Sequence, residues 1–330
     1  MSRILVTGAT GFVGPALVEE LARAGHQVRV ALRRDAPVLA GVEYTITGGI
    51  GPETDWRPAL IGVGAVVHLA ARAHVSDAGP DALARFRQVN SLGTKRLAEA
   101  AAASGVRRFV FLSSVKAMAE SSPPGRPLSE VDPARPEDAY GRSKREGETA
   151  LLDVAAGCGM EPVILRAPLV YGPGVKGNFL RLLRLVDRGL PLPVGAVANR
   201  RSLVARANLV CALRQCVEAE AAAGQIFLVA DGEDLSTPEL VRRLARALGK
   251  TPRLLPVPSV VLRTAGRLAG RSAELARLTG DLTIDASLIR ARLGWRPVTG
   301  VDAALAETVA WFRRGQQRKG EPQRHRDTEM

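Results

Sequence analysis

A glycine-rich segment near the N-terminus, VTGATGFVG at residues 6–14, constrains the fold of this chain more than any other feature. The apolar run ILVTG at 4–8 predicts a buried strand, and the apolar spacing over 12–25 predicts a helix directly after it. A glycine turn between a strand and a helix lets backbone amides approach a pyrophosphate, which the helix N-terminus also attracts. The segment therefore predicts a dinucleotide-binding unit, and the alternative is a tight turn that binds no ligand. The candidate cofactor-binding residues of the turn are Gly8, Thr10, Gly11, Phe12, Val13 and Gly14.

Short β-rich runs alternate with longer helical patterns through the first half of the chain. Strands are expected at 27–32, 65–71, 107–114 and 161–168, and helices at 86–105 and 140–159. This alternation predicts an α/β fold with a Rossmann-type, doubly wound parallel sheet that carries helices on both faces.

The pattern changes after Pro168, where the chain becomes rich in glycine and then mixed in character. We expect residues 1–168 to form the Rossmann domain, with part of 200–230 returning to it. Residues 169–312 are expected to form a smaller mixed α/β region that mainly binds the substrate. The basic tail at 313–330 lacks apolar periodicity and is expected to be disordered.

The charge balance suggests nucleic acid at first sight, since the net charge is +13. Of the 46 basic residues, however, six are lysine and 40 are arginine, and they are spread along the chain. We interpret this as a composition bias and expect no nucleic-acid partner. The three cysteines include no CxxC pair, which disfavours a metal site and fits a reducing cytoplasm. The chain contains no run of 18 apolar residues, so we expect no membrane span.

The segment YGRSK places Tyr140 and Lys144 four residues apart, and so on one face of an expected helix. An ammonium near a phenol favours the phenolate, so we expect Lys144 to lower the pKa of Tyr140 towards the working pH. Tyr140 would then serve as a general acid or base beside a nicotinamide cofactor. Taken alone, the pair could also be an exposed aromatic and its basic neighbour.

Two serines end the expected strand at 107–114, where hydroxyl groups would reach the crevice at the carboxyl edge of the sheet. We expect Ser114 to hold the substrate oxygen, with Ser113 as the second choice. The set of Ser114, Tyr140 and Lys144, together with the glycine turn, is the predicted catalytic group.

Arg33 and Arg34 precede Asp35 at the end of the second expected strand, where NAD sites carry an acidic residue. A guanidinium can bind the 2′-phosphate of NADP through two hydrogen bonds. We therefore expect NADP in preference to NAD. The alternative is that arginine occupies these two positions only because it is frequent throughout the chain.

The GxxGxxG spacing and the order of serine, tyrosine and lysine resemble the extended short-chain dehydrogenase/reductases, and among them the NAD-dependent epimerase/dehydratase family. Further matching segments are HLAA (68–71), VNSLGTKRL (89–97), LRAPLVYGPG (165–174), RRSLVARANLV (200–210) and DASLIRARLGWRP (285–297). The resemblance implies cofactor contacts at Leu69, Ala70, Ala71, Asn90, Tyr140, Lys144 and Pro168. It implies substrate contacts at Ser113, Ser114, Asn178 and Arg201, of which the last two would lie beside a diphosphate.

The resemblance further implies an NAD(P)-dependent oxidoreductase or epimerase that acts at C4 of a nucleotide-activated sugar, with UDP as the expected nucleotide. We favour 4-keto reduction. The alternatives are a UDP-hexose or UDP-N-acetylhexosamine 4-epimerase with tightly bound NAD, a ketone reductase of the dihydroflavonol-reductase type, and a cofactor-binding sensor without turnover. Dimerisation through helices of the Rossmann half is typical of the family.

The chain departs from the family pattern at two places, VKAMAE at 115–120 and VARAN at 204–208. Both segments lie near the expected sugar site. They leave the hydride chemistry in place and the identity of the sugar open.

Overall fold

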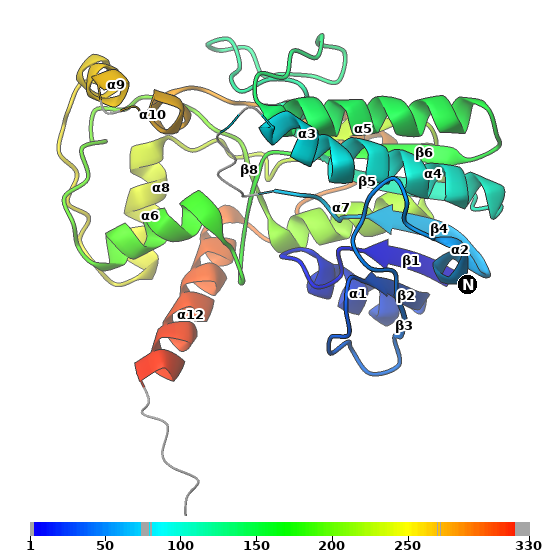
Figure 1. Cartoon of the computed structure of the whole chain (residues 1–330). Coiled ribbons are helices and arrows are strands. Elements are labelled where there is room, and N and C mark those ends of the chain that lie inside the picture. The colour runs from blue at the N-terminus through cyan, green and yellow to red at the C-terminus, as the bar shows by residue number, and fades with distance from the viewer. Residues whose placement is uncertain (1–2, 74–78, 80, 269, 271, 321–330) are drawn as a thin grey trace, which may run out of the picture.

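The computed structural model describes residues 3–73, 79, 81–268, 270 and 272–320 (Figure 1). Within these residues the main sheet has seven parallel strands in the order β3-β2-β1-β4-β5-β6-β9. The strands are β1 (Arg3–Thr7), β2 (Gln27–Leu32), β3 (Glu43–Ile46), β4 (Val63–His68), β5 (Arg108–Ser114), β6 (Glu161–Ala167) and β9 (Ile226–Leu228). The predicted α/β fold with a doubly wound parallel sheet is confirmed, and the strand order reverses between β1 and β4.

The sheet is apolar on both faces, because successive side chains of a strand point to opposite sides. In β1, Ile4 and Val6 belong to one core and Leu5 to the other. The first core is covered by α1 (Gly14–Arg23), α7 (Arg206–Glu218) and α11 (Ser287–Leu293). The second core is covered by α2 (Arg57–Leu60), α4 (Gly93–Ala103) and α5 (Ala139–Ala156), and α3 (Ala82–Arg87) lies beside α5 (Figure 1).

The second region lies to the left of the sheet in Figure 1 and has an apolar core of its own, which includes Phe179, Leu183, Leu244 and Leu305. Its elements are the parallel pair β7 (Leu169–Tyr171) and β8 (Leu203–Ala205), with α6 (Gly177–Asp187), α8 (Thr237–Ala247), α9 (Ser259–Leu268), α10 (Ser272–Thr279) and α12 (Val301–Gly320). Three short helical turns complete the described elements: a π-helix η1 (Gln88–Leu92), and the 3₁₀-helices η2 (Val115–Ala117) and η3 (Glu220–Ala222).

Two segments from the later part of the chain return to the main sheet. Strand β9 pairs with β6, and α7 packs against α1. The chain therefore crosses between the two regions more than once, and the segments beside the sheet are not continuous in sequence.

Three expectations about individual elements were wrong. The expected strand at 65–71 ends at His68, because the next residues turn towards the glycine segment, where the Ala70 N–H lies 3.3 Å from Thr7 Oγ1. The expected helix at 86–105 is interrupted by the π-helix η1. The tail was expected to be disordered from 313 onwards, but α12 continues to Gly320 and the Gln316 amide donates to Asp187. Residues 321–330 lie outside the described residues.

Candidate active site

The glycine turn between β1 and α1 is a close-packed backbone cradle. Gly8 has a φ of +72°, and a Cβ there would lie 2.7 Å from the backbone N of Ala70. A Cβ at Gly14 would lie 2.4 Å from the Gly8 carbonyl oxygen. No side chain caps the N-terminus of α1, and its first turn contains no acidic residue. This geometry fits a dinucleotide, whose pyrophosphate would accept from the backbone N–H groups of the turn and the helix.

The other predicted cofactor residues come together at the same edge of the sheet. Each follows the carboxyl end of a parallel strand, which is where ligands bind in open α/β sheets. Leu69, Ala70 and Ala71 follow β4, Pro168 follows β6, and Arg33 and Arg34 follow β2. The two arginines are exposed, as is Asp35 after them.

A buried chain of hydrogen bonds connects the glycine turn with the helices behind it. Thr7 Oγ1 lies 2.6 Å from His68 Nδ1, and His68 Nε2 lies 3.1 Å from Thr94 Oγ1. Because Thr94 gives its own proton to the Asn90 carbonyl at 2.8 Å, His68 Nε2 must be the donor and Nδ1 the acceptor. Burial, with a smaller contribution from the Lys144 ammonium, lowers the pKa of His68 to about 3, so the ring is neutral at any physiological pH. His68 thus has a structural role, since it connects Thr7 at the end of β1 with Thr94 on α4.

Asn90 extends this chain to α5, the helix that carries Tyr140 and Lys144. It lies on the π-helix η1 and is 1% exposed. Its Oδ1 accepts from Arg72 N at 2.8 Å, and its Nδ2 donates to Ser143 Oγ at 3.0 Å. Ser143 in turn donates to the Tyr140 carbonyl oxygen at 2.8 Å. Asn90 was predicted to contact the cofactor, but its amide is committed to holding the segment after β4 against the first turn of α5.

Tyr140 is the second residue of α5 and is half-buried. Its ring packs edge-on against Phe86, with ring centroids 6.0 Å apart. Burial and, to a smaller extent, the Asp138 carboxylate raise the pKa of Tyr140 to about 12, against the opposing effect of a hydrogen bond with Ser114. The expectation that Lys144 lowers this pKa is therefore wrong for the structure as it stands, because desolvation outweighs every nearby charge.

Lys144 lies one turn further along α5 and is 1% exposed. Its ammonium donates to the Leu112 carbonyl oxygen at 2.7 Å and lies 3.9 Å from the centre of the Phe111 ring. Burial lowers the pKa of Lys144 to about 7, against the opposing effect of Glu148. A buried lysine that titrates near neutral pH has the properties expected of a functional group.

The two serines at the end of β5 differ in their surroundings. Ser114 is partly exposed, and its hydroxyl accepts from Lys116 N at 3.2 Å at the start of η2. Ser113 is buried and donates to Glu148 at 2.5 Å. Glu148 also receives two hydrogen bonds from Arg166, at 2.9 and 2.7 Å. Ser113 therefore belongs to a buried ionic cluster under the site, which argues against its predicted contact with the substrate.

The predicted diphosphate residues lie on elements of the second region. Asn178 is exposed in the first turn of α6. Arg201 bridges two segments through its backbone, and its guanidinium donates to the Gly280 carbonyl at 3.0 Å. Burial lowers the pKa of Arg201, Glu120 raises it, and the charge of Arg277 lowers it further. Arg201 and Arg277 thus bring two cations to the same place.

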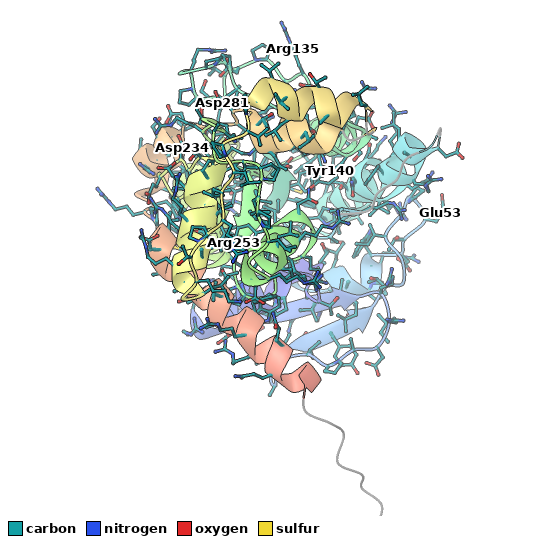
Figure 2. All side chains as sticks on the ribbon, turned by 90° about the vertical axis from the view of Figure 1, so that its left-hand side faces the viewer. Glu53, Arg135, Tyr140, Asp234, Arg253 and Asp281 are labelled. Atoms are coloured by element: carbon teal, nitrogen blue, oxygen red, sulfur yellow. The ribbon has the colours of Figure 1, made fainter. Side chains whose placement is uncertain are left out.

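Arg277 belongs to a group of charges that the sequence analysis did not identify. With Lys116, Glu120 and Asp138 it forms an ion-pair network between η2, the start of α5 and α10. Figure 2 looks onto this end of the molecule and labels Tyr140, and the Arg277–Asp138 pair connects α10 to the start of α5. The only signal in the sequence was that VKAMAE departs from the family pattern.

Other kinds of site find no support in the described part of the chain. No group of three or more His, Cys, Asp or Glu residues there could hold a metal ion. Among the helices of that part, none combines the length and the apolar character needed to cross a bilayer.

Comparisons with known proteins agree with this geometry. A model of the NAD dependent epimerase/dehydratase family matches residues 4–230. A UDP-glucose 4-epimerase of Vibrio cholerae is 44% identical over 312 residues, which cover 94% of this chain and 95% of the relative. The structure of MoeE5 in complex with UDP-glucose and NAD aligns with a TM-score of 0.77 and 28% identity, over 95% of this chain and 99% of that one. The UDP-glucose 4-epimerase of Thermus thermophilus in complex with NAD gives 0.74 and 27%, over 94% and 99%. The chain belongs to the NAD dependent epimerase/dehydratase family, as its motifs implied.

Proposed function

We propose that the protein is an NAD-dependent 4-epimerase of a UDP-linked sugar. The observation that carries the proposal is the placement of Ser114 and Tyr140 together at the carboxyl edge of the sheet, in a chain 44% identical to a UDP-glucose 4-epimerase. The glycine turn, the segment Leu69–Ala71 and Pro168 would hold the dinucleotide. Arg201 and Asn178 would face the diphosphate of the substrate.

Ser114, Tyr140 and Lys144 have separate roles in the proposed reaction. Ser114 holds the O4 hydroxyl of the sugar towards Tyr140. Tyr140 takes the O4 proton as C4 is oxidised and returns it when C4 is reduced from the other face. A bound NAD would accept and return the hydride, and its positively charged nicotinamide ring would favour the Tyr140 phenolate that burial otherwise disfavours. Lys144 has a pKa near neutral pH, which suits a group that exchanges a proton beside Tyr140.

The choice of epimerisation revises our preference for 4-keto reduction. The relative with 44% identity is a 4-epimerase, and the two solved relatives described above contain NAD. The expected preference for NADP finds no support in them. An epimerase regenerates its cofactor in each cycle, so tight retention of NAD follows from the proposal.

The test is to purify the protein, identify any retained dinucleotide by mass spectrometry, and assay interconversion of UDP-glucose and UDP-galactose without added cofactor. We expect Tyr140→Phe to lower kcat about 100- to 10,000-fold and to leave retained NAD nearly unchanged. Tyr44→Phe is the matched control, because Tyr44 is 50% exposed on the edge strand β3. Full activity of Tyr140→Phe would contradict the proposal.

One observation favours a second candidate, the reduction of a 4-keto sugar by NADPH. Arg33 and Arg34 stand exposed after β2, where they could meet a 2′-phosphate. In that case the purified protein would retain no NAD, and turnover would require added NADPH. Replacing both arginines with alanine should then weaken NADPH binding, and an unchanged affinity would eliminate this candidate.

A further inference from the structure

Lys116 lies at the centre of the ion-pair network that borders Tyr140. Its ammonium is 2.7 Å from Glu120 Oε1 and 2.7 Å from Asp138 Oδ2. Arg277 reaches the same two carboxylates from α10, but at the longer distances of 3.5 and 3.4 Å. Among the described residues, Lys116 is therefore the closest cation to both acids.

The backbone of Lys116 is also built into the site. Its N–H donates to Ser114 Oγ at 3.2 Å. A Cβ at Gly141 would lie 2.3 Å from its carbonyl oxygen, so the first turn of α5 rests directly on Lys116. Residue 116 thus lies between the serine and the helix that carries Tyr140.

Asp138 links Lys116 to the phenol. Its Oδ1 caps α5 by accepting from Gly141 N at 2.6 Å, and its Oδ2 accepts from Lys116. Burial alone would raise the pKa of Asp138, but the hydrogen bonds from Lys116 and Gly141 outweigh it and the pKa is lowered. Asp138 is therefore ionised at neutral pH, two residues before Tyr140.

We propose that Lys116 is a positioning residue for Tyr140: by pairing with Asp138 and Glu120 it compensates their negative charge next to the phenol, and so controls how readily the phenol ionises. The consequence for catalysis rests on the proposed function, in which Tyr140 moves the proton. The electrostatic statement about Lys116 and Tyr140 stands apart from it and can be tested without turnover.

The direction of the effect follows from the charges that face Tyr140. Among the described residues they are Asp138 at the N-cap of α5, Lys144 on α5, Lys116 and Glu120 at η2, Arg277 on α10, and Arg72, whose guanidinium lies 5.9 Å from the Phe86 ring that packs on Tyr140. Asp138 raises the pKa of Tyr140. Removing the Lys116 ammonium strengthens that effect, because Arg277, the other described cation that pairs with these acids, is farther away.

The chain contains three tyrosines, so a probe placed on every tyrosine gives few signals to assign. Replacing them with a fluorinated tyrosine makes each phenol more acidic, so that it titrates while the protein is folded. ¹⁹F NMR then follows Tyr44, Tyr140 and Tyr171 separately, and Tyr140→Phe identifies the signal of interest. The same variants are assayed for the pH dependence of kcat in the NAD-bound enzyme.

We expect Lys116→Met to move the Tyr140 midpoint upwards by about half a pH unit or more, and Lys116→Arg to restore it. Asp138→Asn keeps a capping side chain but removes the charge, so the midpoint should fall. The double variant should return close to the wild-type value. Lys250→Met is the matched control, because it breaks a lysine–carboxylate pair with Asp187 outside the network.

An unchanged midpoint in folded Lys116→Met would overturn the proposal. If that variant does not fold, Asp138→Asn decides: a lower midpoint supports the proposal, and an unchanged one overturns it. Failure of the proposed function would be a separate result. It would appear as full activity of Tyr140→Phe, and the ¹⁹F titrations would still measure the effect of Lys116 on the Tyr140 midpoint.

Discussion

The proposed cofactor side of this site, around the glycine turn, and the proposed substrate side, around Lys116 and Arg277, are formed by different kinds of atoms. Around the glycine turn, backbone atoms meet backbone atoms, and a Cβ at Gly8 or Gly14 would collide with them. Around Lys116 and Arg277, long charged side chains from separate elements meet each other. The first arrangement depends on a few adjacent residues, and the second depends on the whole fold.

This difference explains what each side can tolerate. A backbone cradle has no side chain that can move aside, so a substitution changes its shape directly. A charged network can rearrange, because its members are partly exposed and water can replace a lost partner. We therefore expect the largest effects on the cofactor side and beneath it, and graded effects on the substrate side.

Gly14→Val tests the backbone cradle of the glycine turn directly. The new Cβ would lie 2.4 Å from the Gly8 oxygen and 2.5 Å from the Ala9 oxygen, so the turn must open. We expect complete loss of retained NAD, measured by mass spectrometry, and a stability loss of about 1–3 kcal/mol. Gly159→Val is the control, because a Cβ there meets open space. Retention of NAD by Gly14→Val would show that the cradle is not the cofactor site.

Glu148→Ala tests the buried cluster beneath the site. It leaves Arg166, which is 2% exposed, without its carboxylate. Chemical denaturation should show a loss of about 3–5 kcal/mol. Glu146→Ala on the same helix breaks an exposed pair with Arg87 and should cost at most about 1 kcal/mol. Equal losses of stability in the two variants would mean that the buried Glu148–Arg166 pair contributes no more than the exposed Glu146–Arg87 pair.

Lys144→Met separates catalysis from stability. The folded-state pKa of Lys144, about 7, lies below that of an unfolded lysine, so the unfolded chain binds more protons between these values. Burying Lys144 therefore costs stability that is fully expressed below pH 7 and disappears as the pH rises to about 10. We expect Lys144→Met to be inactive but about 1–3 kcal/mol more stable at pH 7, with a smaller gain near pH 10. Denaturation at the two pH values checks this, and a gain that does not shrink would contradict it.

Arg201→Gln probes the substrate side. The guanidinium donates to the Gly280 carbonyl, and the charges of Glu120 and Arg277 act on it. We expect the KM for the UDP-sugar to rise about 10-fold, which corresponds to one lost charged hydrogen bond, while retained NAD stays unchanged. Arg200→Gln is the neighbouring control, since Arg200 is exposed. If Arg201→Gln lowered the retention of NAD and left the KM unchanged, Arg201 would act at the cofactor and the prediction would be wrong.

Local motifs predicted the glycine turn between β1 and α1, which the structure shows as a close-packed backbone cradle. Gly8 and Gly14 could be assigned because a tight turn needs them whatever surrounds it, and the alternation of elements predicted the parallel sheet. The roles of Ser113 and Asn90 were less accessible. Each lies in a matching motif, but only the packing of α5 against β5 and η1 commits their side chains to Glu148 and Ser143.

The sequence by itself determined the α/β class, the family, the glycine turn and the pairing of Tyr140 with Lys144 on one helix, because these depend on residues close together in the chain. The tertiary structure decided the ionisation of those two groups, which follows from burial, and the partners of Lys116. It brought Lys116, Asp138 and Arg277 together from η2, the start of α5 and α10. No short-range pattern encodes that meeting, because electrostatic interactions depend on distance in space and on the water that the fold excludes.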